Sequence, residues 1–290
     1  MSVEVSDIAL PENTILKYRY RVEEVHYLGH TGIVYFGVDL DDHSEVVIKE
    51  FMPYRIANRD MNGKDVICKS EGCRNSFNRA RVAFEQECEY VYKLRDVKKP
   101  YPGCVIQYHD SFTENETTYL ITDKIRGKSL QDYLENGVDF SVRETMKMLV
   151  DVVMQIHKKG IIHCDIKPSN IVVQEDGRIV LIDFGTACYK NKAEDEMLFA
   201  SRGYSAPELY HGGKIDEKTD IYSIGAILYY MLTDSQLPAP DDMDDAEEVP
   251  ALSEMISIPP LLEWVIMKSI QRNRSKRLGS LFLMKIVLKL

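Results

Sequence analysis

The stretch from about Tyr20 to Glu50 consists of short runs in which apolar and polar residues alternate. β-Branched and aromatic side chains fill most of the apolar positions, and Gly29, Gly32 and residues 41–44 supply turn signals between the runs. A period of two with such breaks is typical of strands that bury one face. We therefore expect a three-stranded antiparallel meander in this part of the chain.

From Asn78 to Leu94 the period changes to that of an amphipathic helix. The apolar positions of this helix are Val82, Phe84, Cys88, Val91 and Leu94. Two further strands are expected near Val105–Phe112 and Thr118–Thr122, where β-type residues return. Strands combined with a helix predict a small α+β unit for the first part of the chain.

After Gly127 the pattern is mainly helical. Four segments carry helical periodicity: 129–135, 141–159, 220–232 and 261–271. The second of them opens with a Ser-x-x-Glu capping-box pattern. Apolar runs at 171–173 and 179–182 flank an Asp-Gly turn and predict a hairpin. We expect a mostly helical second unit, with Lys124–Gly127 as a short hinge between the two.

Composition narrows the class of protein. With 290 residues, of which 44% are apolar, the chain can bury a substantial core. The formal net charge of −10 and the acidic run at 241–248 argue against a nucleic-acid-binding protein. We interpret that acidic run as a solvated loop.

Six scattered cysteines in a chain of this size favour a reducing cytoplasm over a disulfide framework. Cys68 and Cys73 lie close together, but no second pair with zinc-ligand spacing lies nearby. The first seven residues lack the basic and apolar regions of an export signal. The apolar run Leu281–Leu290 is too short to cross a bilayer and is expected to form a last core-facing helix. We expect a cytoplasmic protein without a transmembrane segment.

The strongest chemical signal lies in the segments His163–Asn170 and Asp183–Gly185. In-line phosphoryl transfer needs a carboxylate beside the attacking hydroxyl, a cation near the moving phosphate, and oxygen ligands for Mg²⁺. These groups are available in Asp165, Lys167, Asn170 and Asp183. The expected hairpin would bring Asn170 and Asp183 to the same end, where both can serve one metal ion.

The same segments resemble the catalytic and metal-binding loops of the eukaryotic-type (Hanks-type) serine/threonine protein kinases. Further motifs follow in the family's order: Lys49, Glu87, Ala206-Pro207-Glu208, Asp220 and Arg277. The run Ile48–Pro53 is similar to kinases of bacterial signalling systems. The resemblance implies a bilobal α+β protein-kinase fold. It implies a kinase domain at 20–288, with a small β-rich N-lobe at 20–124, a larger and mostly helical C-lobe at 125–288, and an N-terminal extension at 1–19.

By this resemblance, the chain transfers the γ-phosphate of ATP to protein hydroxyls with Mg²⁺ or Mn²⁺. Asp165 is the implied catalytic base, and Lys167, two residues later, favours serine/threonine transfer. Asn170 and Asp183 are the implied metal ligands. Ser201 is expected to contact both Asp165 and Lys167.

Lys49 is the implied strand lysine that holds the α- and β-phosphates. Its family partner is a helix glutamate, for which Glu87 and Glu85 compete, and Glu87 lies on the apolar face of the helix. The remaining ATP contacts implied by the resemblance are Gly29 and Gly32 over the phosphates, Val34, Val47 and Val172 as apolar walls, Thr122 as gatekeeper, and the backbones of Asp123 and Ile125 on the purine edge. The implied pairings of Glu208 with Arg277, and of Asp220 with the backbone near His163, are structural.

The chain departs from the family pattern in two places. Its glycine turn is shortened by two residues, which offers fewer N–H donors to the phosphates. Cys164 replaces the arginine that usually precedes the catalytic aspartate, a non-RD variant, so no cation there can bind a phosphate on the activation loop. Between Gly185 and Ser201 the only hydroxyls belong to Thr186 and Tyr189. We therefore expect activity that does not depend on phosphorylation of that loop. A redox sensor at Cys164 is the alternative to an inert buried thiol.

Two other functions compete with the kinase. An ATP-binding pseudokinase or scaffold with little transfer activity is suggested by the short glycine turn and by Cys164. A small-molecule phosphotransferase is disfavoured by Ala206–Glu208, a motif of kinases that seat a peptide. The expected partners are protein substrates and ATP, not nucleic acid, and the oligomeric state is not set by the sequence. Residues 54–76 are interpreted as a polar insertion with a candidate regulatory role.

Overall fold

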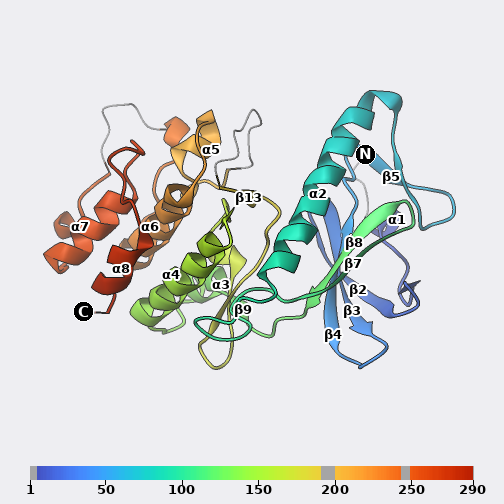
Figure 1. The fold of residues 1–290 in the computed structure, drawn as a ribbon, viewed down its shortest axis with the longest axis horizontal. Coiled ribbons are helices and arrows are strands. Elements are labelled where there is room, and N and C mark those ends of the chain that lie inside the picture. Colours follow the sequence, from blue (N-terminus) through green and yellow to red (C-terminus); the bar gives the residue numbers. More distant parts are fainter. Residues whose placement is uncertain (1–4, 191–199, 243–248, 290) are drawn as a thin grey trace. The chain divides into compact units, whose positions relative to one another are not determined.

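The computed structural model describes residues 5–190, 200–242 and 249–289. Contacts divide the chain into two compact units, one of Met1–Arg95 with Ile106–Lys124, the other of Asp96–Val105 with Ile125–Leu290. Figure 1 shows the elements of both units. Most of the acidic run at 241–248, which was expected to be a solvated loop, lies outside the described residues, as does the stretch 191–199.

The first unit is built on a six-stranded antiparallel sheet in the order β1-β2-β3-β4-β8-β7. Its strands are β1 (Ile15–Leu16), β2 (Tyr20–Leu28), β3 (Gly32–Asp39), β4 (Glu45–Phe51), β7 (Tyr108–Glu114) and β8 (Thr117–Asp123). β2, β3 and β4 form the meander that the alternating pattern predicted, which is thereby confirmed. β8 then pairs with β4, so β4 lies inside the sheet with a partner on each side.

Helix α2 (Arg74–Leu94) lies beside this sheet and begins four residues before the expected start at Asn78 (Figure 1). Its Phe84 is buried and contacts the ring of Phe51 on β4, with ring centroids 5.7 Å apart. The expectation that Val82 belongs to the apolar face is wrong, because this side chain is 52% exposed. Val82 precedes Phe84 by two positions, which puts it on another side of the helix.

The segment interpreted as a polar insertion forms a hairpin in the structure. β5 (Ala57–Arg59) pairs with β6 (Val66–Cys68) through Ala57↔Cys68 and Arg59↔Val66. Ala57 and Val66 are buried, and a short 3-10 helix at Glu71–Cys73 leads into α2. A short helix, α1 (Val5–Ile8), precedes the sheet. The β5–β6 hairpin and α1 both belong to the first unit.

The second unit is mainly helical. Its helices are α3 (Leu130–Glu135), α4 (Val142–Lys158), α5 (Pro207–His211), α6 (Glu217–Thr233), α7 (Pro260–Ser269) and α8 (Leu281–Val287). The four expected helical segments and the last core-facing helix are confirmed, with ends that differ by a few residues. α6 begins earlier than Asp220 because Asp216 caps it, its side chain accepting a hydrogen bond from the Lys218 amide at 3.0 Å.

Short strands complete the second unit. They are β9 (Lys128–Ser129), β10 (Ile161–Ile162), β11 (Ile171–Val173), β12 (Ile179–Leu181) and β13 (Cys188–Tyr189). β11 and β12 form the predicted hairpin, and β10 pairs with β13. Val105, expected to begin a strand that ends at Phe112, instead bridges Leu181 in the second unit, and β7 starts only at Tyr108. None of the helices in the described part of the chain has the length and apolar character needed to cross a membrane.

Candidate active site

Asp165 lies in the loop between β10 and β11, and its side chain is largely buried. Ser201 donates a hydrogen bond from Oγ to Asp165 Oδ1 (2.6 Å), and Lys167 Nζ lies 2.7 Å from Asp165 Oδ2. Lys167 Nζ also donates to Ser201 Oγ (3.0 Å). The expected contact of Ser201 with both residues is confirmed. A carboxylate that accepts a hydroxyl hydrogen bond beside a cation has the geometry required of a general base.

Asn170 closes the same loop. Its Nδ2 donates to the backbone oxygen of Asp165 (2.9 Å) and to Asp165 Oδ2 (3.1 Å). Because the amide nitrogen is committed to Asp165, the amide oxygen is the atom that can ligate a metal ion. A backbone hydrogen bond from Ile182 to Asn170 (3.0 Å) continues the β11–β12 hairpin, so Asn170 and Asp183 lie at the same end of it.

Asp183 is exposed and has a left-handed backbone with φ of 62°. Its Oδ1 accepts a hydrogen bond from the Gly185 amide at 3.3 Å. The next residue, Phe184, is buried against the His163 ring, with centroids 4.7 Å apart. An amide oxygen and an exposed carboxylate at one hairpin end are ligands that Mg²⁺ prefers. The donor set therefore fits a magnesium ion.

Asp220 of α6 is fully buried and holds the backbone of the catalytic loop in place. Its carboxylate accepts backbone hydrogen bonds from His163 and Cys164, both at 2.9 Å, and a third from His157 Nε2 at 2.8 Å. Burial alone would raise the pKa of Asp220, but the hydrogen bonds from His157 and the backbone hold that pKa below its ordinary value. The expected pairing of Asp220 with the backbone near His163 is thus confirmed.

These bonds fix an unusual backbone. Cys164 has a φ of 65°, a conformation that costs about 1–3 kcal/mol for a residue with a side chain. Such strain persists only where the surroundings hold it, and here the Asp220 carboxylate does so. The Cys164 side chain is buried in an apolar cluster with Ile162, Cys188, Leu209 and Ile215, against which Ala200 packs.

A buried ion pair supports the segment after Ser201. Arg277 donates from Nη1 and Nη2 to the two oxygens of Glu208, at 2.7 and 3.0 Å, which confirms the expected pair. Thr219 Oγ1 adds a hydrogen bond to Glu208 Oε1 at 2.9 Å. Two-point Arg–carboxylate bonds fix orientation as well as distance. The Ala206–Glu208 motif is therefore held at the start of α5.

In the first unit, Lys49 of β4 donates to both oxygens of Glu87 on α2, at 2.6 and 2.9 Å. Glu87 is buried, whereas the competing Glu85 is exposed. The helix register derived from Phe84, Cys88 and Val91 thus selected the correct partner. An ammonium tied to a buried carboxylate has a defined position on the sheet surface.

The pairing of the strands places further expected ATP contacts on the same face of the sheet as Lys49. Val34 is opposite Lys49, and Val47, two residues before Lys49, is opposite Thr122. Directly paired residues, and residues two apart on one strand, share a face of a sheet. Val34, Val47, Lys49 and Thr122 therefore lie on one face of the first unit.

The glycine turn joins β2 to β3, and Gly29 donates its amide hydrogen to Gly32 O at 2.9 Å. A Cβ on Gly32 would lie only 2.2 Å from the backbone oxygen of Glu50, so no other residue fits there without a shift. Asp123, the residue before the expected hinge, ends β8, and its carboxylate is bound by His109. Ile125 and Val172 belong to the second unit, where Val172 pairs with Val180.

Sequence reasoning missed several residues of these networks. His157, which binds Asp220, looked like an ordinary residue of an amphipathic helix. Cys188 and His109 carried no motif. Arg59, in the insertion, binds Glu50 beside Lys49. A signal for Arg59 did exist, since the alternation of β4 places Glu50 on a buried face, and a buried carboxylate requires a partner.

Comparisons with known proteins agree with this geometry. The family described as "Protein kinase domain" matches residues 27–285. Serine/threonine-protein kinase cds1 of Schizosaccharomyces pombe is 31% identical over 172 residues, which cover 56% of this chain and 36% of that protein. A probable serine/threonine-protein kinase of Clostridium acetobutylicum is 26% identical over 287 residues, which cover 91% of this chain and 38% of that protein. The chain thus spans well under half the length of both relatives.

Among solved structures, the one described as "PpkA-294 apo form" has a TM-score of 0.79 at 23% identity, with 97% of this chain and 99% of that chain covered. This likeness confirms the expected α+β protein-kinase fold, and the clostridial relative confirms the likeness to bacterial kinases. The family match covers most of the chain, and the Lys49–Glu87 pair, the Asp165 loop and the buried Asp220 stand within it in the expected order. The chain therefore belongs to the protein kinase domain family.

Proposed function

We propose that the chain is a protein kinase that transfers the γ-phosphate of Mg-ATP to serine or threonine hydroxyls of other proteins. The observation that carries this proposal is the contact of Asp165 with a serine hydroxyl and with the Lys167 ammonium. Asp165 accepts the proton of the attacking hydroxyl, and Lys167 stabilises negative charge on the transferring group. Asn170 holds the Asp165 carboxylate in place through its amide nitrogen.

Asn170 and Asp183 are the proposed ligands of Mg²⁺, or of Mn²⁺. When bound, the ion neutralises phosphate charge and orients the terminal phosphate. Lys49 binds the α- and β-phosphates, and Glu87 keeps its ammonium in place. The proposed remaining contacts of ATP are Gly29, Gly32, Val34, Val47, Thr122, Val172 and the backbones of Asp123 and Ile125.

We further propose a kinase domain at residues 20–288, with an N-lobe at 20–124, a C-lobe at 125–288 and an extension at 1–19. A reducing cytoplasm is the proposed location, which six cysteines that are not joined in disulfides support. The proposed partners are protein substrates rather than nucleic acids, because the net charge is −10.

The test is transfer of labelled phosphate from ATP to a generic protein substrate and to the chain itself. Wild type is compared with Asp165→Asn and Lys49→Met, and Asp176→Asn, which changes an exposed carboxylate, is the matched control. We expect both site variants to lose at least about a hundredfold in rate, and labelled serine or threonine after hydrolysis. Binding of Mg-ATP with equal and negligible transfer by wild type and Asp165→Asn would instead identify a pseudokinase. Transfer to aminoglycosides or sugars alone would identify a small-molecule phosphotransferase.

A further inference from the structure

Glu50 follows Lys49 on β4 and is completely buried. Because neighbouring strand residues point to opposite faces, Glu50 projects away from the Glu87 side of the sheet. Tyr35 donates its hydroxyl to Glu50 Oε2 at 2.7 Å, and Tyr119 donates to Glu50 Oε1 at 3.0 Å. Burial and the adjacent Glu50 carboxylate raise the pKa of both phenols, so both remain donors.

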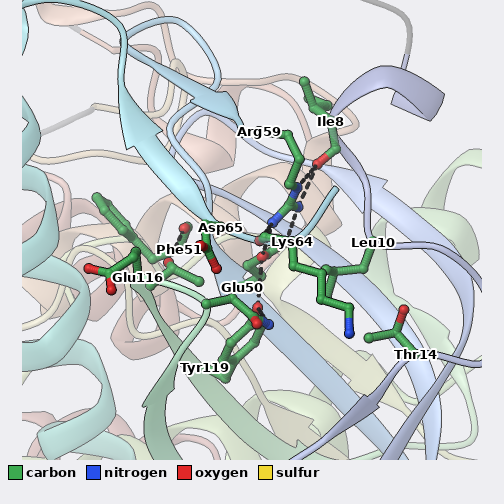
Figure 2. Close-up of polar contacts among 12 residues, drawn as sticks. Ile8, Leu10, Thr14, Glu50, Phe51, Arg59, Lys64, Asp65, Glu116 and Tyr119 are labelled. Carbon is green, nitrogen blue, oxygen red and sulfur yellow. Dashed lines mark hydrogen bonds and ion pairs between the residues drawn. The ribbon is translucent and has the colours of Figure 1, made fainter. Parts of the chain in front are cut away.

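The charge of Glu50 is matched by Arg59 from the insertion hairpin. Arg59 Nη1 and Nη2 donate to the two Glu50 oxygens at 2.6 and 2.7 Å. Its remaining N–H groups donate to two backbone oxygens, Lys64 O at 2.7 Å and Ile8 O at 2.5 and 2.9 Å. Figure 2 shows the guanidinium between Glu50 and the carbonyl of Ile8. All five guanidinium donors therefore have acceptors, and the Arg59 side chain is only 4% exposed.

The N-terminal segment completes this network. Ile8 supplies its carbonyl to Arg59, and the Leu10 amide donates to the Tyr35 hydroxyl at 3.0 Å. Ile8 and Leu10 are both buried, although they precede residue 27, where the family match begins. Ile8 and Leu10, which lie outside the family match, are thus linked to Glu50 on β4 through one side chain each. Arg59 makes the link for Ile8, and Tyr35 makes it for Leu10.

Stability alone does not require such an arrangement. A buried ion pair is often no more stabilising than apolar side chains of the same volume, but its bonds fix one geometry. Here the fixed group is one residue from Lys49, on a strand that is tied on the same side to Tyr35 and Tyr119. A shift of this strand by a fraction of a residue would move Lys49 relative to Glu87.

We propose that Arg59 is a positioning residue for Lys49: together with the Ile8–Leu10 segment it holds Glu50, and thereby β4, where Lys49 meets Glu87. This inference rests on the proposed function, since it assigns Lys49 to ATP. Arg59 binds the Glu50 side of β4 and acts on Lys49 only through that strand. The Ile8–Leu10 segment and the β5–β6 hairpin therefore contribute to the nucleotide site, because they position Lys49.

The experiment uses the full chain and four changes. Arg59→Met removes the charge and keeps the aliphatic stem, Arg59→Lys returns one charge, and Leu10→Asp undocks the N-terminal segment. Arg74→Met is the matched control, because it removes an arginine from an exposed ion pair in the same unit. Two quantities are measured on folded protein, well below the melting temperature of each variant. They are kcat/KM for ATP, and the rate at which an acylating reagent modifies Lys49 without nucleotide, read by mass spectrometry.

We expect Arg59→Met to lower kcat/KM for ATP by about ten- to a hundredfold, since small displacements of a catalytic group are costly. Acylation of Lys49 should become several-fold faster, because its ammonium is held less firmly by Glu87. Arg59→Lys should recover part of both effects, and Leu10→Asp should act in the same direction as Arg59→Met. Arg74→Met should leave both quantities unchanged.

A merely structural role for Arg59 predicts a different result. Arg59→Met would then lower the melting temperature while leaving kcat/KM and the acylation rate of folded protein at wild-type values, and this outcome overturns the inference. If Arg59→Met does not fold, Arg59→Lys and Leu10→Asp decide by the same two quantities. Lys49→Met is assayed in parallel. If it transfers phosphate as fast as wild type, the proposed function itself fails. In that case the rate of Lys49 acylation in the Arg59 and Leu10 variants still reports on the positioning of Lys49.

Discussion

The Sγ atom of Cys164 lies 3.7 Å from the Sγ atom of Cys188 within a buried apolar cluster. Cys164 belongs to the catalytic loop, and Cys188 belongs to β13, which follows the Asp-Phe-Gly motif. Both cysteines are buried, and they are thiols that are not joined in a disulfide. Apolar packing, rather than an ion pair, therefore connects the catalytic loop to the start of the activation segment, the stretch that follows Asp183–Gly185.

This packing predicts that phosphate transfer does not require phosphorylation of the activation segment. Cys164 presents no cation to a phosphate, and the cluster is assembled from neutral side chains. We expect the transfer rate to be unchanged after treatment with a protein phosphatase that is removed before the assay. Loss of activity, together with a phosphosite mapped to residues 186–204, would contradict the prediction. Residues 191–199 of that range lie outside the described part of the chain.

The buried Asp220 predicts a pH-dependent contribution to stability. Its folded-state pKa is lowered, so the ionised carboxylate stabilises the fold fully above its ordinary pKa of 3.8, and this contribution is lost as the pH falls through the lowered value. Asp220→Asn leaves at least one of the donors from His157, His163 and Cys164 unpaired, because an amide has one acceptor oxygen. We expect it to cost about 1–3 kcal/mol at pH 7.

Urea unfolding followed by the fluorescence of Trp264, the single tryptophan, measures this cost. The difference between wild type and Asp220→Asn should stay constant above about pH 5 and shrink below about pH 4. Asp176→Asn, at an exposed carboxylate, is the control and should change stability by less than about 0.5 kcal/mol. A difference that grows on acidification would show that the sign is wrong.

Sequence patterns predicted the elements because these depend on short-range order, whereas the resemblance to protein kinases implied the pairing of distant residues such as Lys49 and Glu87. The period of two gave β2, β3 and β4, and the helix register of Phe84 and Cys88 distinguished Glu87 from Glu85. The hairpin between β11 and β12 placed Asn170 and Asp183 at one end. Each of these inferences needs only neighbours along the chain and the geometry of one element.

Contacts between distant segments were not predictable in this way. Arg59 finds Ile8, 51 positions away, only once the insertion folds into a hairpin. Cys188 approaches Cys164 because β13 pairs with β10, although neither strand is longer than two residues. Val82 was assigned to the core because apolar character alone does not fix the side of a helix that is buried. Pairings of short strands leave almost no periodic signal in a sequence.

Asp123, at the end of β8, predicts the titration of a neighbouring histidine. The hydrogen bond to Asp123 raises the pKa of His109 above its ordinary value of 6.5, although partial burial opposes this. The protonated pair stabilises the fold fully below pH 6.5, and the contribution is lost as the pH rises through the raised pKa. We expect Asp123→Asn to lower the pKa of His109, measured by NMR titration of its ring protons.

Asp110→Asn provides the comparison for this titration, because the Asp110 carboxylate is bound by Lys17 rather than by His109. It should leave the pKa of His109 near the wild-type value. Urea unfolding should also show Asp123→Asn losing most relative to wild type in mildly acidic solution and least in alkaline solution. An unchanged His109 pKa in Asp123→Asn would mean that another group sets it.

The two glycines of the turn between β2 and β3 should respond differently to the same change. A Cβ at Gly32 would lie 2.2 Å from Glu50 O, so β3 and β4 must separate where β4 carries Lys49. A Cβ at Gly29 would approach the Tyr27 ring to 3.3 Å, and that side chain is 60% exposed and can turn away. We expect Gly32→Ala to cost about 1–3 kcal/mol and Gly29→Ala to change stability by less than about 0.5 kcal/mol.

Urea unfolding and the KM for ATP, measured on both variants, check this difference. Gly32→Ala should raise the KM for ATP several-fold, because displacement of Glu50 O moves the strand that presents Lys49 to Glu87. Gly29→Ala should leave the KM for ATP close to that of wild type, because a contact that Gly29 makes through its backbone N–H survives the added methyl group. A larger rise in KM for Gly29→Ala than for Gly32→Ala, without loss of stability, would contradict this prediction and would show that a methyl group at Gly29 obstructs the phosphates. The close approach of β3 to β4 at Gly32 would then be a requirement of folding alone.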